Sequence, residues 1–426
     1  MPIVAGARVR PVVRVVSAAE ASHRERAAIA AGTPSRALMQ RAGAAAASEI
    51  ARRWHERLRD GVLLYAGPGN NGGDAWVAAR ALAASGIAVT VCEAEEARAP
   101  DAVFERALAI PLVQCEQSSK ATIVVDGLLG TGARGEPRGA IAEAISAISA
   151  RRMHGAIVIA LDTPSGVDAT TGETKHAVAA DVTLTFGALK RGLLIARQQV
   201  GSVAVLDIGL GDSGDDDGAP QLVTAAWVRE TVPAILADAH KGSRKKLAIL
   251  GGAPGMAGAP VLAARAAMRS GIGMVKLVVA AESLAAVQGA EPYALASEWP
   301  SAVESLSQAM LGWADAVLLG PGLGETPLAR DLVNRVLQEW RGPVILDADA
   351  LNLFRGNMDA LGGLLKGRPA LLTPHPAEAS RLANVSVQEI LSRRFEIGAE
   401  IARATNSAVL LKGVPTVITA VDGIRM

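Results

Sequence analysis

The chain has few aromatic residues and almost no cysteine. Phenylalanine, tryptophan and tyrosine make up only 3% of its 426 residues, while hydrophobic residues of all kinds reach 50%. We therefore expect cores of small aliphatic side chains, which suit helices packed on parallel sheets. The two cysteines, Cys92 and Cys115, are too few for a disulfide framework, and no Cys-x-x-Cys or His-Glu-x-x-His spacing predicts a zinc site. This composition indicates a reducing cytoplasm.

Neither sign of charge dominates, and long apolar runs are absent from the sequence. The 43 lysines and arginines balance 42 acidic residues to a net charge of +1, which gives no indication of a nucleic-acid or anionic membrane partner. No run of about 18 strongly apolar residues predicts a membrane span. Residues 1–16 lack the apolar stretch and cleavage pattern of a secretory signal. We expect a cytoplasmic protein that acts as a homo-oligomer, without nucleic acid or membrane.

Short β-branched runs alternate with alanine-rich helical stretches, a pattern typical of parallel α/β sheets covered by helices. At about 150 residues per domain, the length predicts two or three domains. Residues 209–220, GLGDSGDDDGAP, predict a solvated linker between a domain at 1–208 and a second at 221–426. The predicted strands are Val62–Ala66, Ala88–Cys92, Thr122–Asp126, Ala156–Asp162, Val182–Phe186 and Val203–Asp207, then Leu247–Leu250, Val275–Val279, Ala316–Leu319, Val344–Asp347, Ala370–Leu372 and Ala408–Leu411.

Three strands of the first domain each run into a glycine-rich loop. The motifs are GPGNNGGD at Gly67–Asp74, VDGLLGTGARGE at Val125–Glu136 and LDTPSGVD at Leu161–Asp168, with a helix predicted from about Asp74 to Ala84. Glycine lets the backbone approach a ligand closely, and the start of a helix offers free N–H groups to phosphate. One such loop could be an ordinary strand–helix turn. Three at the carboxyl ends of parallel strands predict a nucleotide site.

The second domain repeats this arrangement with five motifs that each follow an apolar strand. They are the segment Ala239–Pro260 containing LGGAPGMAGAP, LLGPGLG at Leu318–Gly324, LDAD at Leu346–Asp349, LTPHPAE at Leu372–Glu378 and KGVPT at Lys412–Thr416. Each motif alone could be a loop or a helix cap. Their order along successive strands predicts a second nucleotide site.

The three motifs of the first domain, with LMQRAG at Leu38–Gly43, resemble those of NAD(P)H-hydrate epimerases over roughly Ser17 to Gly209. The resemblance implies a Rossmann-like domain that interconverts the R and S forms of hydrated NADH or NADPH, with Asp162 as the acid/base. It also implies a potassium ion held by Asn71, Asp126 and Ser165, whose oxygen atoms suit a hard cation. The residues implied for the dinucleotide are Asn70, Asn71, Gly72, Gly73, Asp74, Gly130, Thr131, Gly132, Ala133, Arg134, Gly135 and Glu136.

The second half resembles the ADP/ATP-dependent NAD(P)H-hydrate dehydratases, which have a ribokinase-like α/β fold. The resemblance implies Mg²⁺ and ADP or ATP, phosphorylation of the ring hydroxyl of the S form, and elimination of phosphate. Ala259, Gly322 and His375 are implied to face the hydrated dinucleotide. The residues implied for the adenine nucleotide are Lys412, Gly413, Val414, Pro415 and Thr416. Together the halves resemble a bifunctional NAD(P)H-hydrate repair enzyme.

Two alternatives stay open for the second half. It could be a ribokinase-like kinase of a small molecule, or a nucleotide-binding module without turnover. The sequence stops at Asp422–Met426, before the Gly-Asp loop that the resemblance leads us to expect, with its anion hole and catalytic aspartate. We therefore expect the second domain to lack its last segment, and the sequence leaves its dehydratase activity open.

Overall fold

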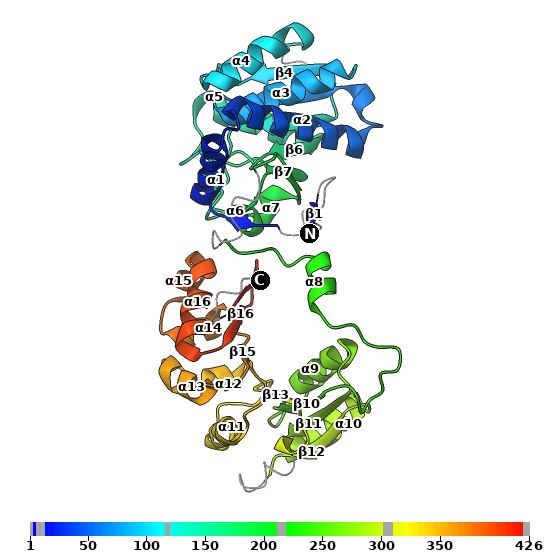
Figure 1. Cartoon of the computed structure of the whole chain (residues 1–426), viewed down its shortest axis with the longest axis vertical. Coiled ribbons are helices and arrows are strands. Elements are labelled where there is room, and N and C mark those ends of the chain that lie inside the picture. The colour runs from blue at the N-terminus through cyan, green and yellow to red at the C-terminus, as the bar shows by residue number, and fades with distance from the viewer. Residues whose placement is uncertain (1–2, 6–12, 116–119, 211–218, 301–309, 421–426) are drawn as a thin grey trace. The chain divides into compact units, whose positions relative to one another are not determined.

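The computed structural model describes residues 3–5, 13–115, 120–210, 219–300 and 310–420. The chain divides into two compact units, Met1–Trp227 and Val228–Met426 (Figure 1). Each unit is a parallel or mainly parallel sheet between two layers of helices, which confirms the predicted α/β fold class. Most of the predicted linker, residues 211–218, lies outside the described residues, as does Asp422–Met426, so the predicted domain boundaries stay predictions. No helix in the described ranges has the length and apolar character to cross a membrane.

The first unit is built on a seven-stranded parallel sheet in the order β1-β9-β7-β6-β5-β3-β4. The six strands predicted here are confirmed to within one residue, and β1 was not predicted. The strands are β1 (Ile3–Ala5), β3 (Val62–Ala66), β4 (Val89–Glu93), β5 (Ile123–Gly127), β6 (Ile157–Leu161), β7 (Val182–Phe186) and β9 (Ser202–Leu206). The short strands β2 (Val15–Val16) and β8 (Leu189–Lys190) form a separate parallel pair, also not predicted.

Helices cover both faces of this sheet. On one face lie α2 (Ser35–Trp54) and α3 (Asn70–Ala84), and on the other lies α5 (Gly139–Met153). Side chains of β3 alternate between the two cores, since Leu64 packs with α2 and α3 whereas Leu63 packs with α5. The other helices of the unit are α1 (Ala18–Ala30), α4 (Pro100–Ala109), α6 (Arg191–Ile195) and α7 (Arg197–Val200).

Helix starts follow local hydrogen bonding and packing. A capping box between Ser17 and Glu20 begins α1, and the turn at Gly32–Pro34 separates α1 from α2. The predicted start of α3 at Asp74 is wrong, because the helix begins at Asn70. A Cβ on Gly72 would lie 1.9 Å from the Gly67 carbonyl oxygen, so glycine lets the first turn of α3 pack on the preceding loop.

The strand order of the first unit reverses between β3 and β5. The chain moves outward from β3 to β4 and then crosses to β5 on the other side of β3. Such a reversal leaves a crevice at the carboxyl ends of the two strands, where ligands of open α/β sheets bind. The loops flanking the crevice begin at Gly67 and Leu128, within two of the predicted motifs.

The second unit has an eight-stranded sheet in the order β12-β11-β10-β13-β14-β15-β16-β17, parallel except for the last pair. The six predicted strands are confirmed to within one residue, while β12 and β17 were not predicted. The strands are β10 (Lys246–Leu250), β11 (Met274–Val279), β12 (Leu295–Glu298), β13 (Ala316–Leu319), β14 (Val344–Leu346), β15 (Ala370–Leu372), β16 (Ala408–Leu411) and β17 (Val417–Thr419).

Two helical layers again enclose the sheet of the second unit. One consists of α9 (Gly258–Arg269) and α10 (Ala281–Ala290), packed through the core that contains Ile249. The opposite core, which contains Leu250, holds α11 (Pro327–Glu339), α12 (Asp349–Asn352), α13 (Met358–Leu365), α14 (Pro376–Ala383), α15 (Val387–Ser392) and α16 (Arg394–Thr405). Helix α8 (Ala225–Thr231) spans the division between the units. The strand order reverses between β10 and β13, which creates a second crevice at their carboxyl ends.

Gly320 fixes the loop that follows β13 at this crevice. Its φ is +116°, and a Cβ would lie 1.8 Å from the Asp347 carbonyl oxygen. We expect Gly320→Ala to lower the free energy of unfolding of the second unit by about 3 kcal/mol or more, because both the conformation and the contact exclude a Cβ. Differential scanning calorimetry of the full chain would measure the loss as a lower Tm for one transition.

Gly363→Ala is the matched control for Gly320→Ala. Gly363 lies in α13 and is exposed, and a Cβ placed on it would have no atom within 4 Å. Alanine has the higher helix propensity, so this variant should be as stable as the wild type or more stable by up to about 1 kcal/mol. Equal Tm values for Gly320→Ala and the wild type would contradict the steric explanation.

Candidate functional site

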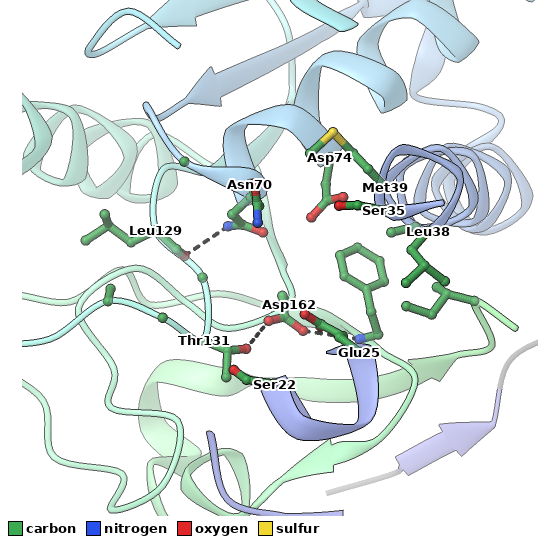
Figure 2. Close-up of a pocket in the computed structure, with 18 of the residues that line it drawn as sticks. Ser22, Glu25, Ser35, Leu38, Met39, Asn70, Asp74, Leu129, Thr131 and Asp162 are labelled. Carbon is green, nitrogen blue, oxygen red and sulfur yellow. Dashed lines mark hydrogen bonds between the residues drawn. The ribbon is translucent and has the colours of Figure 1, made fainter. Parts of the chain in front are cut away.

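A pocket of about 380 Å³ lies at the carboxyl ends of the first sheet, where the strand order reverses between β3 and β5. Figure 2 shows side chains from α1, α2, α3 and the loops after β5 and β6 around it. Eight of the residues predicted from sequence line this pocket, namely Asn70, Asn71, Asp74, Gly130, Thr131, Gly132, Ala133 and Asp162. The structure therefore brings together residues from all three predicted motifs.

The other predicted dinucleotide residues do not line this pocket. Gly72 and Gly73 are buried in the first turn of α3, where they allow close packing. Arg134, Gly135 and Glu136 are exposed farther along the loop after β5. Their predicted contacts with a dinucleotide stay predictions.

Asp162 directly follows β6 in a conformation that few side chains adopt. Its φ is +60°, in the left-handed region. The Thr131 hydroxyl donates to Oδ2, whereas Oδ1 accepts from the Lys190 ammonium group and, at 3.3 Å, from the Phe186 N–H. These partners come from the loop after β5 and from the segment between β7 and α6, so they fix the carboxylate within the pocket.

Lys190 is the buried cation of this site. Its side chain is only 2% exposed, pairs with Asp162, and donates to the Phe186 carbonyl at 2.9 Å and the Thr185 hydroxyl at 3.1 Å. Burial alone would raise the pKa of Asp162. The charge of Lys190 and the hydrogen bonds from Lys190, Thr131 and Phe186 outweigh burial and hold that pKa below its usual value. Asp162 is therefore ionised at neutral pH.

The carboxyl groups of Asp74 and Glu25 face the same pocket, and their pKa values are raised rather than lowered. Burial, followed by the negative charges of Asp162 and Glu25, raises the pKa of Asp74 well above its usual value. Partial burial and the charge of Asp162 likewise raise the pKa of Glu25. Figure 2 shows the three side chains pointing into one cavity, from α3, from the loop after β6 and from α1. The pocket thus holds an ionised carboxylate beside two carboxyl groups that retain protons to higher pH.

The residues predicted to bind potassium form a connected buried cluster next to this pocket. The Ser165 hydroxyl and N–H donate to the Asp126 carboxylate at 2.6 Å and 2.8 Å. The Asn71 amide donates to the Leu129 carbonyl at 2.9 Å, and the Leu129 N–H donates to the Ser165 hydroxyl at 2.9 Å. All three predicted ligands are at most 6% exposed. The cluster links α3, β5 and the loop after β6.

The cluster fits a monovalent cation. The Asn71 Oδ1 atom is buried and has no hydrogen-bond donor within the described residues. An unpaired buried oxygen is costly unless a cation or another donor satisfies it. Burial raises the pKa of Asp126 to about 6 even though Ser165 and the Leu128 N–H donate to it. Amide, carboxylate and hydroxyl oxygens together suit a hard cation such as potassium.

Sequence reasoning missed Lys190 and Glu25. Lys190 and Arg191 are the two charged residues within the otherwise apolar stretch FGALKRGLLI, and a charge in such a stretch shortly after a buried strand could have identified Lys190. Glu25 lies on α1, and nothing in its local sequence indicates that its helix borders the pocket.

In the second unit, two residues predicted to face the dinucleotide meet at the reversal between β10 and β13. Gly322 has a φ of +59°, and a Cβ placed on it would lie 3.4 Å from the Cβ of Ala259. The Ala253 N–H donates to the Gly322 carbonyl at 2.6 Å, which joins the two glycine-rich loops. The N-terminus of α9 therefore lies against the loop after β13.

His375 and Lys412 meet through a shared carboxylate, Glu378. His375 caps α14, its Nε2 lies 3.1 Å from one Glu378 oxygen, and the Lys412 ammonium group lies 3.8 Å from the other. Lys412 also donates to Asp347 at 2.7 Å, and the Thr373 hydroxyl donates to the same oxygen at 2.8 Å. The carboxyl ends of β14, β15 and β16 thus form one polar cluster. Asp347 and Glu378 lie within predicted motifs, although the sequence predicted no role for them.

The segment predicted to line an adenine nucleotide follows β16 as a tight loop. Gly413 has a φ of +146°, and its carbonyl accepts from the Thr416 hydroxyl at 3.1 Å. Arg394 of α16 donates to the Pro415 carbonyl at 2.7 Å, and Val414 is 51% exposed. Arg394 therefore anchors the loop to α16, and the apolar side chain of Val414 faces outward.

Known proteins resemble both halves. A sequence profile described as YjeF-related protein N-terminus matches residues 35–192, and one described as NAD(P)H-hydrate dehydratase matches residues 247–424. A bifunctional NAD(P)H-hydrate repair enzyme of Escherichia coli is 36% identical, over 90% of this chain and 74% of its own. That of Coxiella burnetii is 35% identical, over 92% of this chain and 80% of its own.

Among solved structures, a Bacillus subtilis ADP/ATP-dependent NAD(P)H-hydrate dehydratase, co-crystallised with ATP and Mg²⁺, is 33% identical. The structural match covers 47% of this chain and 69% of the Bacillus subtilis chain, with a TM-score of 0.41. The sequence relatives extend across both units, in the order found here. This chain therefore belongs to the family of bifunctional NAD(P)H-hydrate repair enzymes.

Proposed function

We propose that the chain repairs hydrated NADH and NADPH in the cytoplasm, with an epimerase in the first unit and a nucleotide-dependent dehydratase in the second. The observation that carries the epimerase proposal is the pairing of an ionised Asp162 with Asp74 in one pocket, because their pKa values move in opposite directions. Such a pair provides a base and an acid at the same pH. Its partners are small molecules, the hydrated dinucleotide and ADP or ATP.

Epimerisation requires the hydroxyl-bearing ring carbon to lose its oxygen and regain one on the other face. We assign Asp74 as the group that donates a proton to the departing hydroxyl, so that the C–O bond breaks and water leaves. The lone pair of the ring nitrogen stabilises the cation that remains. Asp162 accepts the proton of the water that adds to the opposite face. Lys190 and Thr131 position Asp162 for this transfer.

Asn71, Asp126 and Ser165 are the residues that would hold potassium. The ion would supply positive charge that balances Asp126 and satisfies the Asn71 oxygen. We expect KCl to raise the Tm of the first unit by about 5–10 °C over tetramethylammonium chloride of equal ionic strength, if the ion is in hundredfold excess over its Kd. Thermal unfolding in the two salts measures this without substrate.

Two variants test whether the response belongs to this cluster. Asn71→Leu should abolish the difference between the salts, because it removes the unpaired oxygen. Asn70→Ala is the matched control, since Asn70 is the preceding, exposed residue of α3 and should leave the response intact. Equal Tm values for the wild type in both salts would rule out a potassium site.

The two assigned carboxyl groups predict a bell-shaped pH profile for epimerase kcat/KM. Activity falls on the acid side as Asp162 is protonated. Because the pKa of Asp162 is lowered, this acid limb lies below the pH at which aspartate usually titrates. Activity falls on the alkaline side as Asp74 loses its proton. Because the pKa of Asp74 is raised, this alkaline limb lies well above the pH at which aspartate usually titrates. Glu25 and Asp162 raise the pKa of Asp74, and Lys190 lowers it. We therefore expect Glu25→Gln to move the alkaline limb to lower pH.

Asp74→Asn distinguishes this assignment from a role of Glu25 as the acid. It should remove the alkaline limb and lower the maximum rate, whereas Glu25→Gln should retain most of the rate. If neither substitution changes the alkaline limb, a group other than Asp74 or Glu25 is the acid.

For the second unit, we propose binding of ADP or ATP with Mg²⁺ and dehydration of the S hydrate. The supporting observation is the cluster that joins His375 and Lys412 through Glu378, beside Asp347. Lys412 would bind nucleotide phosphate, and Asp347 would hold Mg²⁺, which would supply positive charge to offset that of the phosphates. Ala259 and Gly322 would face the hydrated ring across the loops after β10 and β13. The Lys412–Thr416 loop would border the adenine.

Turnover of purified hydrates by the full chain tests both proposals. Conversion of the R form to the S form, faster than in buffer, supports the epimerase. Return of NADPH from the S form only with nucleotide and Mg²⁺ supports the dehydratase, and Lys412→Met should lower that rate while Lys366→Met, an exposed control in the same unit, should not. A stable phosphorylated product would indicate the kinase, and nucleotide binding without product the non-catalytic module.

A further inference from the structure

The chain that leaves the first unit returns to it before it reaches the second. Residues 219–222, which include the last two residues of the predicted linker, lie antiparallel to β2. The Val15 N–H donates to the Pro220 carbonyl at 2.8 Å, and the Leu222 N–H donates to the Val13 carbonyl at 2.8 Å. We call residues 219–222 the strap. The strap adds a third segment to the parallel pair of β2 and β8.

β2 lies between the strap and the segment that carries Lys190. The Leu189 N–H of β8 donates to the Arg14 carbonyl at 2.9 Å, and Val16 of β2 is the partner of Lys190 in the parallel register. β2 also leads directly into α1, which brings Glu25 to the epimerase pocket. The strap, β2 and β8 therefore form one patch that places two charged groups of the pocket.

The strap is packed into this patch and does not merely pass over it. Ala219 is 1% exposed and forms a small core with Val16, Ala21 and Ala188. The Arg14 guanidinium donates to the Ala219 carbonyl at 3.3 Å. An isolated two-stranded pair is marginally stable at best in water, and β2 and β8 are only two residues long each. The buried Ala219 and the hydrogen bonds of the strap therefore stabilise the pair.

We propose that the strap belongs to the epimerase site, because residues 219–222 hold β2 and β8 in the position from which Lys190 reaches Asp162. The proposal rests on the proposed epimerase, in which Asp162 is the base. Lys190 is the buried cation that pairs with this carboxylate, and its backbone is paired with β2. The strap residues do not line the pocket, so they are positioning residues. The epimerase unit accordingly extends past β9 to residue 222.

Loosening the strap has an electrostatic consequence that a loss of stability alone would not have. The charged or titratable groups that face Asp162 are Lys190 of β8, Glu25 of α1 and Asp74 of α3. Lys190 is the cation among them, and its charge and hydrogen bond lower the pKa of Asp162 against the effect of burial. If Lys190 moves away, burial and the two carboxyl groups raise that pKa. The acid limb of the epimerase pH profile then moves to higher pH.

Leu222→Pro in the full chain tests the proposal, because proline removes the N–H that donates to Val13. Conversion of the R hydrate to the S hydrate should slow by about tenfold or more, since small displacements of a catalytic group cost up to about 10²-fold. The acid limb should move to higher pH. Val223→Pro is the matched control, because Val223 is 40% exposed and its N–H makes no hydrogen bond within the described residues. It should keep the wild-type rate and acid limb.

Substitutions of Ala219 give a second test that leaves the hydrogen bonds of the strap in place. Ala219→Leu overfills the small core around this residue, so it should slow the reaction and move the acid limb in the same direction. Ala219→Gly adds no atoms and should keep the wild-type acid limb. Variants that lower the Tm and the rate but leave the acid limb unmoved would overturn the proposal, because the strap would then serve stability alone.

Hydrogen exchange of the Leu189 N–H separates this proposal from the proposed function, because it needs no substrate. This N–H donates to β2, so it should exchange faster in Leu222→Pro than in the wild type or Val223→Pro. A wild type without epimerase activity would overturn the proposed function, and faster exchange at Leu189 would still support the strap as the segment that holds β8. An active wild type whose rate, acid limb and exchange are all unaffected by Leu222→Pro would overturn the role of the strap and leave the epimerase standing.

Discussion

Replacing Asp162 by asparagine should lower kcat/KM for epimerisation by about 10²–10⁴-fold, the usual loss when a general acid–base group is removed. Burial opposes ionisation of Asp162, yet Lys190, Thr131 and the Phe186 N–H stabilise its charged form. Asparagine retains the shape of the side chain and can still accept a hydrogen bond, but it cannot take a proton from water. Chromatographic conversion of the purified R hydrate to the S hydrate measures the effect.

The substitution tests chemistry with little change in backbone conformation. Residue 162 has a φ of +60°, and asparagine is among the few residues other than glycine that adopt this region readily. Asp181→Asn is the matched control. Asp181 also accepts from a strand N–H, that of Val158 at 2.9 Å, and pairs with Arg152 at 2.7 Å, but it lies outside the pocket. A loss below about tenfold for Asp162→Asn would exclude the proposed proton transfer.

The position of Asp162 could be predicted from the sequence because its signals are local. An apolar strand followed by Asp162 and the glycine turn of TPSGVD places a carboxyl group at the edge of a parallel sheet. The strands themselves were predicted for the same reason, since a buried parallel strand is a short continuous β-branched run. The reversal of strand order, which creates the crevice beside Asp162, is a property of the assembled sheet and has no local signal.

The partners of Asp162 could not be predicted with the same rules. Lys190 reaches Asp162 from a segment 28 residues further along the chain, and Glu25 comes from α1, which lies between β1 and β3 in the sequence. Their proximity depends on how α1 and the β7–α6 segment fold over the sheet edge. In the second unit, Glu378 unites His375 and Lys412 for a similar reason, because β15 and β16 are adjacent only in the folded sheet.

Replacing Lys190 by methionine should lower the free energy of unfolding of the first unit by about 3–5 kcal/mol at neutral pH, the usual cost of leaving one member of a buried ion pair without its partner. Methionine fills similar volume, so the loss reflects the uncompensated charge of Asp162. Lys175→Met is the control, because the Lys175–Glu173 pair is largely exposed and should contribute no measurable stability. Urea denaturation of the full chain measures both variants.

The free energy of unfolding that Lys190→Met loses should increase with pH. In the wild type, the lowered pKa of Asp162 contributes stability that is present above its unfolded pKa and disappears as pH falls through the folded value. Without Lys190, burial dominates and raises the pKa of Asp162, so the variant should lose stability as pH rises through the new value. The destabilisation is therefore small in acid and complete at neutral pH. A loss independent of pH would attribute the effect to packing.

The double variant Asp162→Asn/Lys190→Met separates the structural role of the pair from its chemical role. It removes both buried charges together, and replacing a buried ion pair by uncharged groups of similar volume is often neutral in stability. We expect its free energy of unfolding to return to within about 1 kcal/mol of the wild type, while epimerase activity stays as low as in Asp162→Asn. Recovery of activity together with stability would mean that Asp162 only holds the pocket together, and the base would then have to be sought among the remaining carboxyl groups of the pocket.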